Sequence, residues 1–373
     1  PEGYRTVIGY GTVAGTDLRS PAPRTYSVRP AADVIQEGYF AFRKIGAGDA
    51  GRVNLTGSTT VLNGTIVGSA VPGHRGGVLD LTGEELMIGT DAAPLPDAFE
   101  YDSPLPEDLK GKLTVASSAL ADKGLAEIRI GDQTDTRAIT LAAGSQLEAP
   151  TVTLRASESI TLEPGSSIRA SGTDGRVGLL SPQGSVNLRE GAQIQASDTV
   201  EVDTASIDLG GGVELDAREL SFSGEKVVFL SDEYAADVPD GVVISEDLWK
   251  KFASVDRLQF HGRSELLFLG DVDLQADADL VLASPLVAGF DPKDESVVSL
   301  SSDRIHLLNS GAGFGDEALA DKGLFSLNAQ EILIGHGDVL LDGFGQVRLA
   351  SQSGVSFVGK GSLTLGGDLE ISA

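Results

Sequence analysis

A nine-residue phrase recurs in the middle of this chain, as Ile139-Thr-Leu-Ala-Ala-Gly-Ser-Gln-Leu147, Ile160-Thr-Leu-Glu-Pro-Gly-Ser-Ser-Ile168 and Val186-Asn-Leu-Arg-Glu-Gly-Ala-Gln-Ile194. The copies start 21 and 26 residues apart, and a looser copy starts 21 residues later at Ile207. Apolar residues alternate with other residues on both sides of a turn that contains Gly, which is the pattern of short strands. A period of this length predicts a solenoid, in which each repeat buries its apolar face against the next.

Strand-like phrases separated by Gly, Ser, Asp and Asn turns continue over most of the 373 residues, with almost no helical periodicity. They predict an all-β fold, namely a parallel β-helix (β-solenoid) with short loop and helix insertions. About fifteen coils, each about 4.8 Å thick, would give a rod on the order of 70 Å long. A leucine-rich repeat needs a helix or an Asn ladder in each repeat, and a β-propeller needs a longer period, so both fit the sequence less well.

Three stretches depart from the repeat. We expect residues 1–45 to form an irregular or extended N-terminal segment, with a strand at 39–45, that leads into a parallel β-helix over residues 46–373. Insertions are expected near 92–112, which is rich in Pro and acidic residues, and near 232–255. In the second insertion Ser245 can cap a short helix with Leu248, Trp249 and Phe252 on its apolar face. The two aromatic residues have two interpretations: they pin this helix to the rod, or they form an exposed platform for a sugar.

Composition narrows the range of partners. The formal net charge of −27 argues against nucleic acid or an anionic membrane, because binding to phosphate needs clustered Lys and Arg. The chain has no Cys, and therefore no disulfide and no thiolate metal site. It contains no run of about 18 apolar residues, so we expect no transmembrane helix. Because it starts at Pro1 and stops within a strand-like phrase, we expect it to be part of a longer protein.

The sequence suggests no catalytic residue and no bound cofactor, and only one weak metal candidate. Asp271, Asp273, Asp277 and Asp279 alternate with apolar residues, so they should stand on outward faces as solvated strand edges or as ligands for Ca²⁺. The Gly-x-Gly-x-x-Gly phrase at 46–51 and the P-loop-like phrase at 354–361 lack the helix or the Ser/Thr that phosphate binding needs. We interpret both as turns and strands. The four histidines, which are His74, His261, His306 and His336, lack zinc-like spacing.

A seven-residue sequence occurs twice, as Ala119-Leu-Ala-Asp-Lys-Gly-Leu125 and as Ala318-Leu-Ala-Asp-Lys-Gly-Leu324. Each copy leads into a strand-like phrase that ends in Ile-Gly, and its first five residues should form one helical turn stopped by Gly. With the Gly-rich turns and the phrase of residues 159–170, this motif resembles the repeat region of filamentous haemagglutinin-like exoproteins, over roughly residues 46–373. The resemblance implies a right-handed parallel β-helix, export through an outer-membrane secretion pore of the two-partner type, and display at the surface of a Gram-negative bacterium. The Asn-Pro-Asn-Leu motif of that family's secretion domain does not occur in this sequence.

Three functions fit such a rod. We expect a non-catalytic structural or adhesive segment of a large secreted exoprotein, that is, an adhesin, a biofilm-matrix component or a filament-forming rod. Its end coils have open strand edges, which favour self-association into filaments. The alternative is a secreted polysaccharide lyase or hydrolase, which needs clustered acidic and basic groups in a groove. A toxin-delivery stalk would need a separate C-terminal domain. The sequence does not identify a host, cell-surface or matrix ligand.

Overall fold

The computed structural model describes residues 3–7, 24–28, 48–91, 95, 99–100, 102–252, 255–290, 296–309 and 322–373. The chain forms two units, residues 1–48 and 49–373. In the first unit β1 (Gly3–Val7) pairs antiparallel with β2 (Arg24–Val28). The sequence did not predict this pair, and the strand that it predicted at 39–45 lies outside the described residues.

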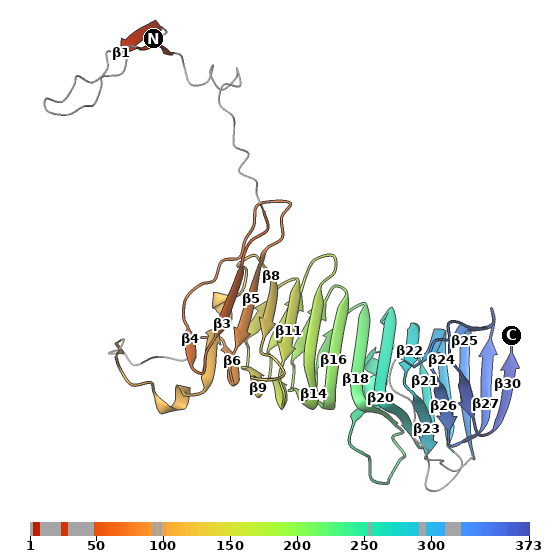
Figure 1. Cartoon of the computed structure of the whole chain (residues 1–373). Coiled ribbons are helices and arrows are strands. Elements are labelled where there is room, and N and C mark those ends of the chain that lie inside the picture. Colours follow the sequence, from red (N-terminus) through yellow and green to blue (C-terminus); the bar gives the residue numbers. More distant parts are fainter. Residues whose placement is uncertain are drawn as a thin grey trace. The chain divides into compact units, whose positions relative to one another are not determined.

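The second unit is a parallel β-helix of about 12 turns, which confirms the predicted fold class. Figure 1 shows its strands stacked side by side from β3 to β30. The expected number of about fifteen coils was too high, because the insertions and long turns use residues without adding a complete coil. No helix in the described part of the chain is long and apolar enough to cross a lipid bilayer.

Each complete coil crosses three sheet faces in order. The first face is built from β3 (Arg52–Thr56), β5 (Gly77–Thr82), β8 (Leu125–Ile130), β11 (Thr151–Arg155), the first halves of β14 (Arg176–Leu188), β16 (Thr199–Leu209), β18 (Glu219–Leu230) and β20 (Arg257–Leu269), then β22 (Asp279–Ala283), the second halves of β24 (Val297–Leu308) and β25 (Gly323–Ile334), and β28 (Val355–Phe357).

The second face is built, in spatial order, from β4 (Thr60–Leu62), β7 (Lys112–Ala116), β6 (Glu85–Gly89), β9 (Ala138–Leu141), β12 (Ser159–Leu162), the second halves of β14 and β16, β19 (Val242–Ser245), the second halves of β18 and β20, β23 (Leu286–Phe290), β26 (Val339–Asp342) and β29 (Leu363–Leu365). The third face has two runs. One is β10 (Gln146–Glu148), β13 (Ser167–Ala170), β15 (Gln193–Ala196) and β17 (Glu214–Asp216). The other is β21 (Val272–Gln275), the first halves of β24 and β25, β27 (Phe344–Ser351) and β30 (Asp368–Ser372).

The recurring phrase of the sequence corresponds to consecutive coils in register. Ile139, Ile160, Val186 and Ile207 pair in one continuous ladder of the second face. The Gly of each phrase turns the chain toward the third face with a positive φ of 68° to 70°, at Gly144, Gly165, Gly191 and Gly212. Only Gly adopts this backbone conformation without strain, so the period of the Gly residues fixes the corner of the coil.

The two insertions do more than extend loops. After β6 the chain leaves the coil, passes through the 3-10 turn η1 (Glu107–Leu109) and returns as β7, which lies between β4 and β6. After β18 it leaves again and returns as β19, which pairs with the edge of β18 opposite to β20. The strand that follows each insertion therefore lies on the N-terminal side of the second-face strand that precedes the insertion in the sequence.

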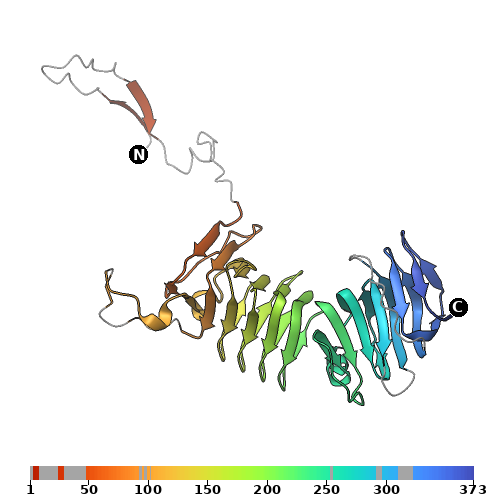
Figure 2. The ribbon, with the colours of Figure 1, turned by 60° about the horizontal axis from the view of Figure 1, so that its bottom comes forward.

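A short helix follows each inserted strand. The 3-10 turn η2 (Ser117–Ala119) follows β7, and α2 (Glu246–Phe252) follows β19. Both connect the second face to the first, so each occupies the third-face position of its coil; Figure 2 shows α2 between the green and cyan strands. Ser245 Oγ accepts a hydrogen bond from the backbone N–H of Leu248 at 3.3 Å, as expected of a cap.

The repeated seven-residue motif is described in full in its first copy only, because residues 318–321 of the second copy lie outside the described part. In the first copy the 3-10 turn ends at Ala119, and the chain then turns through Asp122 and Gly124, which have φ of 55° and 70°. The helical turn thus starts two residues earlier than expected and is of the tighter type.

The interior changes in character along the axis. Between Tyr101 and Phe222 the sequence contains no Phe, Trp or Tyr, and the core there is built from Leu, Ile, Val and Ala. Beyond that point rings contact one another in a chain formed by Phe252, Phe222, Phe260, Trp249, Phe229, Phe268, Phe325 and Phe344. The change begins at the coil in which α2 replaces a third-face strand.

Buried hydroxyl groups close several corners. Thr204 Oγ1 lies 2.9 Å from the carbonyl oxygen of Gly184 in the previous coil and 2.8 Å from that of Ser206. Thr136 Oγ1 and Ser296 Oγ donate in the same way to carbonyl oxygens of neighbouring coils, at 2.8 and 3.0 Å. These bonds satisfy carbonyl groups that leave the sheet ladder where the chain bends.

Candidate functional site

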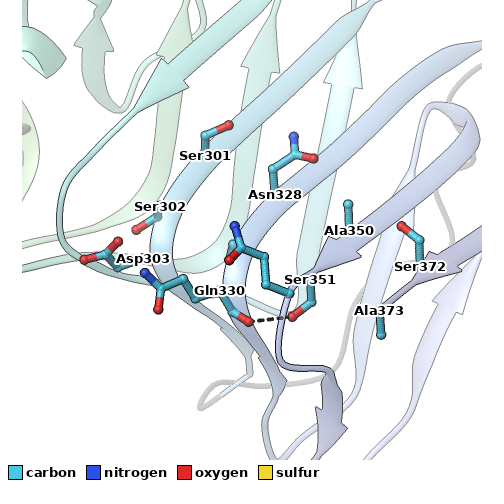
Figure 3. A pocket seen from close by; sticks show the side chains of 11 residues that line it. Ser301, Ser302, Asp303, Asn328, Gln330, Ala350, Ser351, Ser372 and Ala373 are labelled. Carbon is cyan, nitrogen blue, oxygen red and sulfur yellow. Dashed lines mark hydrogen bonds between the residues drawn. The ribbon is translucent and has the colours of Figure 1, made fainter.

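A polar groove runs across the last coils, at the corner where the third face meets the first. It has a volume of about 480 Å³ and is lined by residues of β24, β25, β27 and β30 and by the residues that directly follow the last two: Ser301, Ser302, Asp303, Asn328, Ala329, Gln330, Ala350, Ser351, Gln352, Ser372 and Ala373. Figure 3 shows these side chains on neighbouring strands of the stack. Because all the strands are parallel and in register, equivalent corners of successive coils form one continuous surface.

The register of the strands aligns small or polar residues in rows along the axis. Ser301 pairs with Asn328, Asn328 with Ala350, and Ala350 with Ser372. Ser302, Ala329 and Ser351 form the adjacent row. Adjacent strands lie about 4.8 Å apart, so the groove offers a polar or small side chain at each such step along the axis. The small Ala and Ser side chains leave the space that makes this corner concave.

Some of the hydroxyl groups in the groove serve the fold. Ser351 Oγ donates to the carbonyl oxygen of Gln330 at 2.8 Å, drawn as a dashed line in Figure 3, and accepts from the backbone N–H of Gly354 at 3.0 Å. Ser302 Oγ donates to the carbonyl oxygen of Ala278. By contrast, the side chains of Asp303, Gln330 and Gln352 make no hydrogen bond within the described part of the chain. These are the groups available to a ligand.

The groove is lined mainly by hydroxyl, amide and methyl groups. Hydroxyl and amide groups both donate and accept hydrogen bonds. Glycoside hydrolysis generally uses two carboxyl groups that flank the scissile bond, whereas Asp303 is the one carboxylate among the lining residues and none of them is Lys, Arg or His. The groove therefore lacks the acid–base pair that a hydrolase needs, and it lacks the basic groups that we expected of a lyase.

The four candidate metal ligands point outward but do not form a group. Asp271 and Asp273 flank or lie in β21 on the third face, whereas Asp277 and Asp279 lie at the start of the first face. Asp271 Oδ1 accepts from the backbone N–H of Val297 at 2.8 Å, and Asp279 pairs with Arg304 at 3.1 Å. Within the described residues no three His, Asp or Glu side chains gather in a way that could hold a metal ion. The geometry gives the Ca²⁺ hypothesis no support.

Trp249 and Phe252 are 3% and 1% exposed. Trp249 Nε1 donates to the carbonyl oxygen of Gln275 at 2.8 Å, and its ring stacks on that of Phe260 with 5.8 Å between centroids. The interpretation as an exposed sugar platform is therefore wrong, and the two residues pin α2 to the core.

The Gly-rich phrase at 46–51 leads into a strand, β3, and the phrase at 354–361 contains a strand, β28.

Two of the histidines are partly buried on the outer side of the first face. Burial, reinforced by Arg257, lowers the pKa of His306, and burial, reinforced by Arg263, lowers the pKa of His261. His306 lies beside Val281 and Leu333 in its ladder, and neither neighbour titrates. Asp203 acts on the pKa of His261, and Asp279 and Glu331 act on that of His306, in the opposite direction to burial.

The sequence analysis did not identify the groove. A signal was present in the triplets Ser301-Ser-Asp303, Asn328-Ala-Gln330 and Ala350-Ser-Gln352, which combine small and polar residues at the end of an apolar strand. Their separations of 27 and 22 residues match one coil each. No family model, no curated protein and no solved structure matches this chain.

Proposed function

We propose that this chain is a non-catalytic structural and adhesive segment of a large secreted exoprotein at the surface of a Gram-negative bacterium. The observation that carries the proposal is the groove, a surface of stacked small and polar side chains with one carboxylate, Asp303, and without an acid–base pair. Within the groove, small and polar side chains recur at the same corner of successive coils, and weak contacts to a repetitive partner then add up through multivalency.

The charged outer surface supports the same proposal. Many of its charges are compensated between adjacent coils: Arg304 lies 3.1 Å from Asp279 of one neighbouring strand and 2.9 Å from Glu331 of the other. Arg75 reaches Glu127 at 2.7 Å in the same way. Exposed pairs contribute only about 0.2–1 kcal/mol each. Their main effect is to offset part of the acidic surface charge and to link adjacent coils, which suits a spacer.

Secretion through an outer-membrane pore belongs to this proposal and rests on the resemblance described above. Self-association belongs to it as well. In the last described coil, Leu369 and Ile371 of β30 are exposed, although they continue the buried ladder of Val347 and Leu349. An edge of this kind pairs readily with a further strand, either from a following stretch of chain or from a second copy. Purified chain that stays monomeric at high concentration would argue against filament formation.

The experiment that tests the proposal compares bacteria that display this chain with bacteria that display a β-solenoid spacer of equal length. We expect the first strain to bind more strongly to cells or matrix, and we expect the purified chain to release no reducing ends from neutral or acidic polysaccharides. Equal adhesion of the two strains would overturn the adhesive function. Turnover of a polysaccharide would overturn the non-catalytic assignment in favour of a lyase or hydrolase.

A further inference from the structure

We propose that the corner groove binds a neutral, hydroxyl-rich polysaccharide that lies along the axis of the coils. This inference rests on the proposed binding function and names the class of ligand. It starts from the repetition of the site: the first halves of β24 and β25, and then β27, each lead into a triplet of small and polar residues at the same corner. A site that repeats along an axis is matched by a ligand that repeats along its own length.

The hydrogen-bonding groups fit sugar hydroxyls. Gln330 and Gln352 each carry a carbonyl oxygen and an NH₂ group, so each can accept from one hydroxyl and donate to another. Asp303 adds an acceptor of charge-assisted strength. These three side chains make no hydrogen bond within the described part of the chain, so binding does not require an internal bond to be broken. Ala350 and Ala329 leave room for rings between the polar groups.

The electrostatics select against charged glycans. The lining residues include one carboxylate and no cation, and the chain carries a formal net charge of −27. A uronate or sulfate group would lose water beside Asp303 without gaining a cationic partner, which is unfavourable. A neutral glycan avoids this cost.

The absence of aromatic side chains from the lining residues sets the expected strength. Sugar rings gain no stacking contact in this groove, so a short oligosaccharide should bind weakly. A long polymer can contact several copies of the rod at once, and its apparent affinity then rises by multivalency. The ligand that fits best is therefore a polymer.

The test is affinity electrophoresis of the full chain through native gels that contain a soluble neutral glucan, a polygalacturonate or a sulfated dextran. We expect retardation by the glucan alone. The double variant Gln330→Ala/Gln352→Ala should bind about tenfold more weakly, since it loses two neutral hydrogen-bonding side chains. Ala350→Tyr, which fills the floor of the groove, should weaken binding without removing any polar group.

The matched control is the double variant Gln146→Ala/Gln195→Ala, which removes two outward-facing glutamines from the third face of distant coils. It should migrate like the original chain, and far-UV circular dichroism should show every variant folded. Retardation by a polyanion, no retardation by the glucan, or equal retardation of groove and control variants would each overturn the inference. If the glucan does not retard the chain while displayed chain still promotes adhesion, the inference fails and the proposed function stands. If the glucan retards the chain and the chain also cleaves the glucan, the groove remains the binding site and the non-catalytic assignment fails.

Discussion

Two neighbouring stretches of one solenoid fill the interior of their coils with different kinds of side chain. In the coils of residues 125–216, here called the aliphatic coils, each turn has three strands, and the core is made of Leu, Ile, Val and Ala. In the coils of residues 219–349, called the aromatic coils, α2 replaces one third-face strand, and β23 pairs directly with β26 although one first-face layer, the second half of β24, lies between their coils. The rings of eight aromatic residues lie in this second stretch.

The comparison indicates what the aromatic residues do. A strand–strand–strand coil has a narrow, constant cross-section that branched aliphatic residues fill at normal density. A helix is thicker than a strand, and the direct pairing of β23 with β26 joins two coils that are not consecutive, so the interior needs larger groups. Phe344 illustrates the fit: a Cβ at Gly289 would lie only 2.3 Å from the Phe344 ring. The rings therefore compensate for irregular coils.

The largest effect is expected from Trp249→Ala. The variant loses a buried ring, its stacking on Phe260 and the hydrogen bond to Gln275, so the free energy of unfolding should fall by about 3–5 kcal/mol. Urea unfolding followed by circular dichroism measures this change. Trp249→Phe keeps most of the packing and should lose clearly less. If the two variants were equally destabilised, the ring contacts would not be what holds α2.

A comparable truncation in the aliphatic coils should act locally. Ile160→Ala opens the ladder between Ile139 and Val186 and should cost about 2–4 kcal/mol. Because solenoid coils contact only their neighbours, the loss should be confined to nearby coils. Trp249 is the single tryptophan of the chain, so its fluorescence reports the aromatic coils, whereas hydrogen exchange of residues 138–196 reports the others. We expect faster exchange there and an unchanged fluorescence transition; a shift of both transitions together would show that the two stretches unfold as one.

The regular stretch was the part that the sequence could predict. Its alternation and its repeated Gly corners identify strands, faces and register without further information, because each coil depends on its neighbours in the same way. The backward placement of β7 and β19 could not be predicted, since a strand sequence does not state which edge it joins. The groove could not be predicted for a similar reason. In the sequence Ser302 and Gln330 look like ordinary loop residues, and only the register of the coils brings them to one corner.

The corner hydroxyls give a smaller effect that should be similar in both stretches. Thr204→Val keeps the shape but leaves the carbonyl oxygens of Gly184 and Ser206 without this donor, which should cost about 1–3 kcal/mol. Thr153→Val, on the outward side of β11, is the matched control and should be nearly neutral. Calorimetry compares the two. A neutral Thr204→Val would mean that the corners are closed by the backbone alone.

Arg263 joins the two stretches. It lies in β20, but its guanidinium reaches Asp203 of β16 at 2.6 Å and the carbonyl oxygen of Pro182 at 3.5 Å. Arg263→Ala should lower stability by only about 1 kcal/mol, because the pair is partly exposed. Its clearer signature should be a wider gap between the fluorescence transition and the hydrogen-exchange transition. High salt screens the same ion pair, so it should also widen this gap in the original chain. Arg348→Ala, which breaks an exposed pair with Glu370, should leave the gap unchanged.

The smallest predicted effect distinguishes the two stretches by the sign of their pH response. In the aromatic coils the pKa of His306 is lowered by burial and then by Arg257; Asp279, Arg304 and Glu331 also act on it. The unfolded chain then takes up the proton first, so local stability should fall as the pH falls below about 6.5. In the aliphatic coils partial desolvation and Asp203 raise the pKa of Glu201. Stability linked to that proton is present at low pH and is lost as the pH rises through the carboxylate range. Glu201 is exposed, so screening keeps this term small.

Hydrogen exchange between pH 4 and 7, corrected for the intrinsic pH dependence of exchange, resolves the two responses. His306→Gln should flatten the acid response of the aromatic coils alone, and Glu201→Gln should make the aliphatic coils slightly more stable at pH 7 alone. A different outcome is that either variant changes the pH response of the other stretch. Electrostatic coupling between the two stretches would then be stronger than their coupling through packing. The aliphatic and aromatic coils would differ in composition but would not unfold independently.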